Sequence, residues 1–418
     1  MPLTKITGGE FDDTSNSGLI VSGIITSTEL RVGNTVSIAS TSISVGSAFL
    51  QNNAVGLGST TTTGRNAGVG TAYGTIIYNT TTDQVEIYST GNLWTAVRGR
   101  IAVTGGTVSD ARPGFKVHTF TSSSSSFITD GTLSNVELLV VGGGGGGGGD
   151  RYGAGGGGGG VIYTTGLQIT AGTHPVSVGP GGSAGASGGS AGGQGGDGTS
   201  SQFGPGPTSP FHRIATGGGG GGSGFSPSAN GPGRPGGSGG GASSPSGGAS
   251  GGSATQPAQN PGKPGTNYGN VGGTYVAPLG SGYAPSGGGG AGGAGIGNLG
   301  NVTGGGNGGD GQPISITGSS VRYGAGGGAS IYSTANPPSA VGRGGNGGGG
   351  NGALAQNNTS GSSPNINGVA NTGSGGGGAH GASGALLNNS STTGGAGGSG
   401  IIIVAYPTAD NVVTASPG

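Results

Sequence analysis

An apolar segment, Val136-Glu-Leu-Leu-Val-Val141, runs without interruption into eight consecutive glycines, Gly142–Gly149. No regular Gly-X-Y period follows, which excludes a collagen triple helix. Two interpretations remain, a flexible linker or packed polyglycine II helices, which have three residues per turn and rise about 3.1 Å per residue. Further glycine runs follow along the chain: Gly155–Gly160, Gly217–Gly222, Gly287–Gly290, Gly347–Gly350 and Gly375–Gly378.

Packed glycine helices need an anchor. Ordering one backbone residue costs about 1–2 kcal/mol, most for glycine, whereas a hydrogen bond returns about 0.5–1.5 kcal/mol net. Hydrophobic segments flank the glycine-rich block, with Val136–Val141 before it and Ile401–Tyr406 after it. Shorter strand-like segments lie near them: Phe115–Phe120, Val161–Tyr163, Leu167–Ile169 and Val176–Val178. A linker needs none of these, so residues 111–418 are predicted to form a polyglycine II helix bundle or sandwich anchored by short β-strands, with essentially no α-helix.

Uninterrupted runs and interrupted runs are expected at different depths of this bundle. No Cβ fits where two backbones touch, so Gly217–Gly222 is predicted to be surrounded by other helices. Gly231-Pro-Gly-Arg-Pro-Gly236 can turn Arg234 outward and is predicted to lie on the exterior.

Composition excludes several classes of protein. The 418 residues include 116 Gly, 22 Pro and no Cys, with 13 Lys+Arg against 13 Asp+Glu. Zero net charge with 6% charged residues argues against nucleic-acid binding. The absence of Cys excludes disulfides and thiolate metal sites. Met1–Thr7 has no apolar signal region and Ile401–Tyr406 is too short to cross a bilayer, so neither a cleaved secretory signal nor membrane insertion is expected.

Residues 1–110 are predicted to form a β-rich attachment and shaft region. Short strands are expected within 18–32 and at Thr75–Tyr78, Val85–Tyr88 and Leu93–Val97, whereas Gly58–Gly64 is interpreted as a polar turn. These thin, Ser/Thr-rich strands carry a single Trp and few other aromatic residues, too little for a core of their own. We therefore expect this region to be a homotrimer that buries its apolar edges between copies.

Two stretches resemble known families. Residues 74–97, with Gly-Thr-Ile-Ile-Tyr-Asn at their start and Leu-Trp-Thr-Ala-Val at their end, are similar to a segment of tailed-phage fibre and structural proteins, especially cyanophage ones. Over about residues 115–407, the chain is similar to the glycine-rich domain of phage tail fibres and adhesins. The segments that carry this resemblance, in order, include Val136–Val141 with the glycines that follow, Gly155–Gly160 with Val161–Tyr163, and Gly397-Gly-Ser-Gly before Ile401–Tyr406. This resemblance implies layered polyglycine II helices and loops at one tip that touch the host cell. The inserts Asn260–Ser286 and Ala353–Asn371 depart from the family pattern, so loop function is not transferred residue by residue.

The motifs that suggest catalysis or cofactors are explained by glycine abundance. Gly185-Ala-Ser-Gly-Gly189 matches G-x-S-x-G without a strand-to-helix elbow, and repeated G-x-G-x-x-G patterns precede no helix. Lys263 is followed by Pro264, which excludes a P-loop. The four histidines are His118, His174, His212 and His380, and no metal-ligand spacing connects them. We therefore expect no enzyme activity, no catalytic residues and no cofactor.

Three aspartates allow two interpretations. Asp150, Asp197 and Asp310 each end a G-G-x-G-x-D segment, as in calcium-binding nonapeptide repeats. Such sites need tandem repeats to complete six or more oxygen ligands, and these segments are far apart. An Asx-type turn at the end of a glycine helix is the favoured interpretation, and no metal site is predicted.

Aromatic residues between the glycine runs are the candidate contact residues. They either cap the bundle by packing on one another or offer stacking area to a receptor. The candidates for receptor contact are Tyr268, Tyr275, Tyr283, Tyr323, Tyr332 and Phe211.

The predicted function is that of a non-enzymatic virion fibre or adhesin. It would be assembled in the host cytoplasm, exposed on the particle surface, attached to other virion proteins by its N-terminal region, and bound to a host cell-surface glycan or protein. A purely structural virion or extracellular fibre is the main alternative. An ice-binding protein is a third, although the irregular glycine spacing lacks the flat, regular face that it needs.

Overall fold

The computed structural model describes the chain as two compact units, Met1–Arg98 and Gly99–Gly418. The division lies twelve residues before the expected boundary at residue 110, because β8 (Ile101–Thr104) and β9 (Thr107–Ser109) pair with strands of the second unit. The described residues are 42–45, 48–51, 54–68, 72–89, 93–97, 101–150, 152–186, 193–224, 231–243, 248–256, 260–276, 284–297, 304–331, 341–353, 365–380, 393–408 and 412–414.

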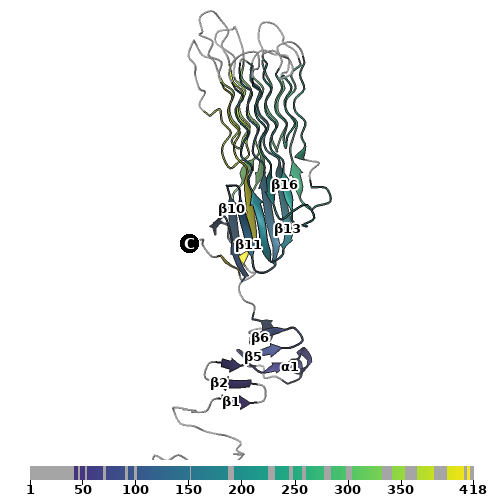
Figure 1. Ribbon diagram of the computed structural model, residues 1–418, viewed down its shortest axis with the longest axis vertical. Helices are drawn as coiled ribbons and strands as arrows, with labels where there is room; N and C mark the ends of the chain where they lie inside the picture. Colours follow the sequence, from purple (N-terminus) through teal and green to yellow (C-terminus); the bar gives the residue numbers. More distant parts are fainter. Residues whose placement is uncertain are drawn as a thin grey trace, which may run out of the picture. The chain divides into compact units, whose positions relative to one another are not determined.

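The N-terminal unit is built from short strands in two sheets. One has the order β1-β2-β3 and the other β4-β5-β6-β7 (Figure 1). The three strands expected between residues 75 and 97 are confirmed, and the segment 18–32 lies outside the described residues. The strands are β1 (Ser42–Val45), β2 (Ala48–Gln51), β3 (Ala54–Gly56), β4 (Ser59–Thr60), β5 (Ile76–Asn79), β6 (Gln84–Ser89) and β7 (Leu93–Ala96).

A short helix replaces part of the polar turn expected at 58–64. Helix α1 (Thr62–Gly68) begins after Thr61, whose hydroxyl accepts a hydrogen bond from the Gly64 amide at 3.1 Å. This is the bond of an N-cap threonine. The helix has only seven residues, too few to produce a helical hydrophobic period in the sequence. Among the described residues it is the only α-helix, as expected for an all-β chain.

Two six-stranded sheets form the base of the second unit. Their orders are β17-β13-β12-β20-β10-β9 and β16-β15-β14-β11-β8-β21. All the strands expected around the glycine-rich block are confirmed, with 161–163 and 167–169 joined into one. The remaining strands are β10 (Phe115–Phe120), β11 (Ser125–Thr129), β12 (Leu133–Val141), β13 (Val161–Ile169), β14 (Gly172–Ser177), β15 (Ser201–Phe203), β16 (Arg213–Ala215), β17 (Thr266–Tyr268), β18 (Gln312–Ile314), β19 (Val321–Tyr323), β20 (Ile401–Pro407) and β21 (Val412–Thr414).

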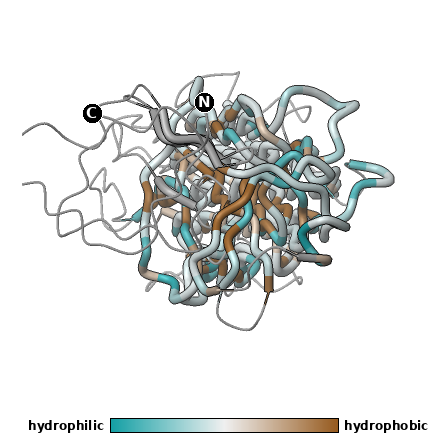
Figure 2. The backbone as a smooth tube through the Cα atoms, turned by 90° about the horizontal axis from the view of Figure 1, so that it is seen from below, coloured by the Kyte–Doolittle hydropathy of each residue, from teal (hydrophilic) through white to brown (hydrophobic). Residues whose placement is uncertain are grey.

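Hydrophobic cores cover both faces of the first of these sheets. On one face, Leu138 and Val404 join a buried cluster with Phe127 and Phe203 of the second sheet. On the other face, Leu139 and Ile403 pack with residues of the β18–β19 hairpin and the segment that precedes β19. Strands buried on both faces read as continuous apolar runs, which explains the composition of β12 and β20. In Figure 2, where the chain is coloured by the hydropathy of each residue, most of the hydrophobic (brown) positions lie toward the middle of the view.

The first glycine run forms backbone hydrogen bonds with a period of three residues. The amides of Gly142, Gly145 and Gly148 donate to segment 154–160, those of Gly143, Gly146 and Gly149 to segment 193–199, and those of Gly144 and Gly147 to segment 395–398, all at 2.8–3.0 Å. Its carbonyls accept from three other segments, 218–221, 182–185 and 376–379. A helix with three residues per turn and six neighbours accounts for this pattern.

The neighbouring segment 154–160 repeats the same arrangement. Its amides donate at every third residue to segments 216–222, 286–289 and 373–376, at 2.7–3.1 Å. These long extended chains rise from the strands and run side by side (Figure 1). The glycine-rich block is therefore an ordered bundle of polyglycine II helices, and β12 leads into one of them while β13 and β20 follow two others.

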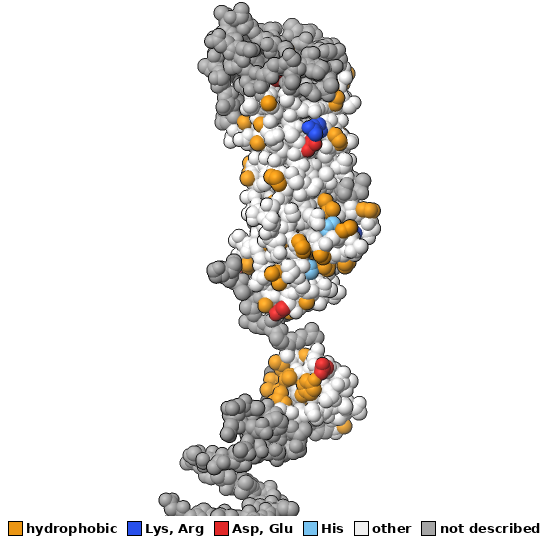
Figure 3. All heavy atoms as spheres, viewed as in Figure 1, with side chains coloured by type: hydrophobic (Ala, Val, Ile, Leu, Met, Phe, Trp, Pro, Cys, Tyr) orange, Lys and Arg blue, Asp and Glu red, His pale blue; other side chains and the backbone are white. Residues whose placement is uncertain are grey.

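Side chains complete the bundle at its surface. Exposed residues recur at every third position on outer helices, as at Pro180, Ser183 and Ala186. Side-chain oxygens replace missing backbone acceptors: Asp197 accepts from the Gly220 amide at 2.9 Å, and Asn367 from the Ala396 amide at 2.9 Å. The face drawn in Figure 3 consists mainly of backbone and small polar groups, with few charged side chains.

The substitution Gly219→Val should destabilise the bundle sharply. Gly219 is buried, and a Cβ placed on it would overlap the carbonyl oxygen of Arg234. Separating these backbones would leave buried polar groups unpaired, at about 1–3 kcal/mol each. Calorimetry of the full chain should show a large fall in the melting temperature of the second unit.

The matched control is Arg234→Ala on the adjacent outer helix. The Arg234 side chain is exposed and forms a 2.9 Å ion pair with Asp197, and such surface pairs contribute about 0–1 kcal/mol. Its loss should change the melting temperature little. Equally small effects of the two substitutions would contradict tight backbone packing at Gly219.

Candidate functional site

The end of the bundle away from the sheets gathers residues from many parts of the sequence. The Gly149 amide donates to the Gly193 carbonyl, and the Ser330 amide to that of Gly153. Other bonds at this end connect Ala353 with Gly378, and Ser243 with Gly231. The residues that end the described helices here are Asp150 and Tyr152, Ala186 and Gly193, Gly224 and Gly231, Ser243 and Gly248, Val276 and Ala284, Gly297 and Gly304, Ile331 and Val341, Ala353 and Asn365, and His380 and Thr393.

Tyr275 is buried near this end. Its side chain is 1% exposed and packs with Ala242 and Ala249, and its backbone exchanges two 2.9 Å hydrogen bonds with Ala249. Tyr275 therefore packs between helices near their ends, with its ring turned into the bundle. The candidates Tyr283 and Tyr332 lie outside the described residues.

The remaining candidates lie at the base of the bundle. Tyr323 is buried in the core under the β18–β19 hairpin, and Phe211 contacts the His174 ring edge-on at 4.8 Å between ring centres. Tyr268, on β17, is half-buried and packs against the same core as Tyr323. Phe211, Tyr275 and Tyr323 are buried, and none of them presents its ring to solvent in this structure.

The family comparison covers both the sheets and the bundle. The sequence model of a family described as a glycine-rich domain matches residues 119–407. The chain belongs to the glycine-rich domain family. No curated protein matches the chain.

The match begins near the end of β10 and runs to the end of β20, including the helices between them. The glycine-rich domain of this chain therefore contains both the β-sheets at the base and the polyglycine II bundle. Across the described ranges, no helix is long and apolar enough to cross a membrane.

Two cations in this domain are held by backbone carbonyls. Arg213 is fully buried and donates to the carbonyls of Pro210, His212 and Pro264 at 2.8–2.9 Å. The Lys263 ammonium donates to the carbonyls of Pro207, Ser209 and His212 at 2.8–3.2 Å. Burial lowers the pKa of both groups, and Arg213 lowers that of Lys263 further.

No carboxylate in the described part of the chain forms an ion pair with either cation. Lys263 therefore joins loop 204–212 to loop 260–265. No sequence pattern indicates this contact, because its acceptors are backbone atoms.

The three aspartates do not meet. Asp197 bonds to the Gly220 amide and to Arg234, and Asp310 accepts from the backbone and side chain of Asn346 at 2.9 and 3.0 Å. Asp150 has a left-handed φ of 66° at the end of the first glycine run. This conformation agrees with the turn expected there. Asp197 and Asp310 instead complete the hydrogen bonding between outer helices.

The histidines are buried on separate elements. His118 Nδ1 donates to the Gly105 carbonyl at 2.7 Å, and its Nε2 is hydrogen-bonded to the Tyr406 hydroxyl at 2.8 Å. Burial lowers the pKa of His118, His174 and His212, and lowers that of His380 to about 4. Within the described ranges, no three His, Cys, Asp or Glu residues come together as metal ligands would.

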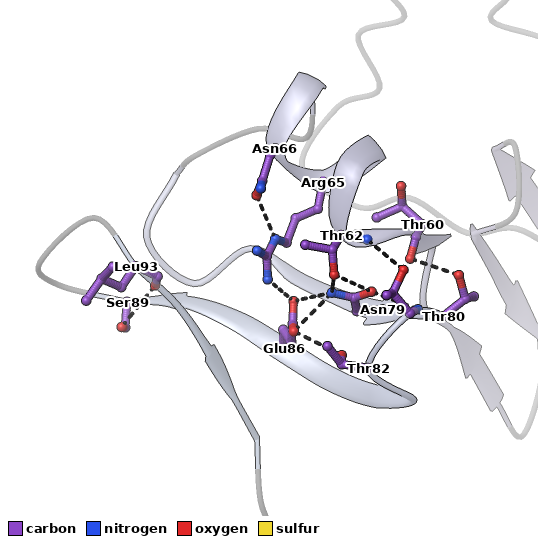
Figure 4. Close-up of polar contacts among 11 residues, drawn as sticks. Thr60, Thr62, Arg65, Asn66, Asn79, Thr80, Thr82, Glu86, Ser89 and Leu93 are labelled. Carbon is purple, nitrogen blue, oxygen red and sulfur yellow. Dashed lines mark hydrogen bonds and ion pairs between the residues drawn. The ribbon is translucent and has the colours of Figure 1, made fainter.

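The N-terminal unit contains a buried polar cluster that sequence reasoning missed. Glu86 on β6 is 5% exposed; it receives 3.1 Å hydrogen bonds from Asn79 and pairs with Arg65 of α1 at 2.7 Å (Figure 4). Thr82 donates to the same carboxylate at 3.2 Å. Burial raises the pKa of Glu86, but the hydrogen bonds from Arg65, Asn79 and Thr82 outweigh it, and the pKa lies below its usual value. The cluster fixes α1 on the sheet.

Acid should weaken this unit through Glu86. Its lowered pKa means that folding favours the carboxylate, so the stabilisation is present above the unfolded pKa of about 4.3 and is lost as pH falls through the folded value. Trp94, the chain's single Trp, lies 5.9 Å from the Arg65 guanidinium. Its fluorescence should therefore report a falling melting temperature below about pH 4. In Glu86→Gln this pH dependence should flatten, and an unchanged profile would contradict the role of Glu86.

Arg213→Met should destabilise the second unit. The change leaves the carbonyls of Pro210, His212 and Pro264 without their donor, and hydrogen bonds to charged groups contribute about 1.5–3 kcal/mol each. Calorimetry should show a marked fall in melting temperature, whereas Arg343→Met, at an exposed arginine, should change it little. Similar melting temperatures for the two variants would argue against the carbonyl contacts as a stabilising feature.

Proposed function

We propose that this chain is a non-enzymatic fibre or adhesin of a tailed-phage virion, and that the end of the bundle away from the sheets contacts the host cell surface. The observation that carries the proposal is the gathering there of helix ends from Asp150 to Thr393. Segments that join these ends in sequence, such as 277–283 and 332–340, include Tyr283 and Tyr332. Loops on a rigid scaffold are where binding residues concentrate.

Two further features support a role in presenting this end of the bundle to a host surface. The helices contribute stiffness but few side chains, so the bundle itself has little chemistry with which to recognise a ligand. The resemblance of residues 74–97 and of about residues 115–407 to phage fibre proteins is the reason for proposing a tailed-phage virion. A glycan or protein on the host surface is the proposed partner, and other virion proteins are the proposed partners of the N-terminal region.

A bacterial glycan array probed with the fluorescently labelled full chain tests the proposal. Wild-type protein should bind a defined set of glycans, and the double variant Tyr283→Ala/Tyr332→Ala should lose most of that binding while keeping its melting temperature. Tyr73→Ala, at an exposed tyrosine of the N-terminal unit, is the control and should bind normally.

Binding lost in Tyr73→Ala but kept in the double variant would place the contact elsewhere. If no glycan and no bacterial cell is bound, the purely structural fibre becomes the better proposal. Tail or baseplate genes beside the coding sequence would support the virion assignment, and their absence would count against it.

A further inference from the structure

Four asparagines in the described part of the bundle directly precede a glycine. The backbone nitrogen that follows an asparagine can attack its side-chain amide, and glycine, which has no Cβ, hinders this attack least. Asparagine is therefore among the thermolabile residues of proteins. The attack needs a glycine nitrogen that can give up its proton and an asparagine side chain that can turn toward it. The four asparagines are Asn307, Asn346, Asn351 and Asn367.

Three of these pairs are held between neighbouring helices. In each, the asparagine side-chain oxygen accepts a hydrogen bond from a backbone amide of the adjacent helix, at 2.8–2.9 Å. The amide of the glycine that follows donates to a carbonyl of that same helix, at 2.9 Å. Such a pair must open locally and break both bonds before it can react. The three are the pairs that begin at Asn307, Asn351 and Asn367.

The fourth pair, Asn346 and Gly347, lies in a turn and lacks both of these bonds. Asn346 is exposed, and Gly347 has a φ of 111°, a conformation that favours glycine. In the part of the chain that the structure describes, no group accepts from the Gly347 amide, and none donates to the side-chain oxygen of Asn346. The nitrogen that attacks and the carbonyl that is attacked are therefore both unbound.

Asp310 connects this turn to the neighbouring helix. Its carboxylate accepts from the backbone amide of Asn346 at 2.9 Å and from the side-chain nitrogen of Asn346 at 3.0 and 3.2 Å. The next amide, that of Gly311, donates to the Asn346 carbonyl at 2.9 Å. The connection therefore uses the side-chain nitrogen of Asn346 as a donor, and it depends on that residue remaining an amide.

We infer that Asn346 is a site of spontaneous deamidation in the folded protein. The Gly347 nitrogen bonds to the side-chain carbonyl carbon of Asn346, the bond from that carbon to Nδ2 breaks, and the Gly347 amide proton leaves with Nδ2 as ammonia. Water then opens the cyclic imide at one of its two carbonyls, which leaves aspartate or isoaspartate in place of Asn346. The sequence of steps consumes only water. It does not depend on host-surface binding.

Deamidation reverses the contact with Asp310. A donor nitrogen is replaced by a second carboxylate, and two carboxylates so close together repel each other. In isoaspartate the main chain also gains one carbon, which shifts the turn away from its register. The connection between segment 304–311 and the turn therefore weakens in the modified chains.

Peptide mapping by mass spectrometry tests the site, after the full chain has been kept in mildly alkaline heavy-oxygen water. Asn346 should exchange its amide for a labelled acid at least about tenfold faster than Asn307, Asn351 and Asn367, which must first break two hydrogen bonds each. The same chain unfolded in urea is the control, and there the four asparagines should react at similar rates. Similar rates at all four in the folded chain would overturn the inference.

The variant Asn346→Asp supplies one product directly and tests the effect on the contact. Hydrogen exchange at the Gly311 amide should be faster in Asn346→Asp than in wild-type protein. Asn346→Ser removes the same donor without adding charge, so it is the matched control and should raise the exchange rate less. A Gly311 amide equally protected in Asn346→Asp and in wild-type protein would show that deamidation does not weaken this contact.

Discussion

Hydrogen bonds between backbones that carry no Cβ atoms hold the second unit together, and the rest of its structure depends on them. Along Gly142–Gly149, a Cβ on any residue would overlap a backbone oxygen of a neighbouring segment. The close approach gives every amide of this run an acceptor within 3.0 Å. Such bonds stabilise only modestly, so the two sheets and their cores must set the spacing and direction of the helices. The hydrophobic strands and the glycine runs are therefore parts of one structure.

The sequence predicted the strands and the bundle because both rest on composition. Val136–Val141 and Ile401–Tyr406 are apolar enough to be recognised without knowing their partners. The pairing of the helices could not be predicted, since one glycine run is chemically identical to another and carries no side chain that specifies a neighbour. The register is instead inherited from β12, β13 and β20 and from side-chain contacts such as Asp197 with the Gly220 amide.

The candidate contact residues were harder to place than the fold. Tyr275 and Tyr323 stand among glycines, where no hydrophobic period tells an inward ring from an outward one. The Arg213 and Lys263 contacts were invisible for a different reason, because backbone carbonyls of any residue can accept such bonds. In the N-terminal unit, Glu86 is a buried acid on a strand, and its ion pair with Arg65 and its hydrogen bonds from Asn79 and Thr82 explain it. The helix itself escaped prediction because seven residues are too few to show a period.

The order of neighbours in the bundle has a consequence for biosynthesis. Gly144 belongs to the first glycine run, yet its amide bonds to Gly398, and β12 pairs with β20, which begins at Ile401, far away in the sequence. The first helix therefore cannot complete its contacts until residues 395–398 and β20 have left the ribosome. Contacts between residues so distant in sequence slow folding, and the exposed strand edges of the waiting chain are prone to aggregation. The scarcity of charge that suits a close-packed bundle leaves the nascent chain little electrostatic repulsion to keep it soluble during that delay.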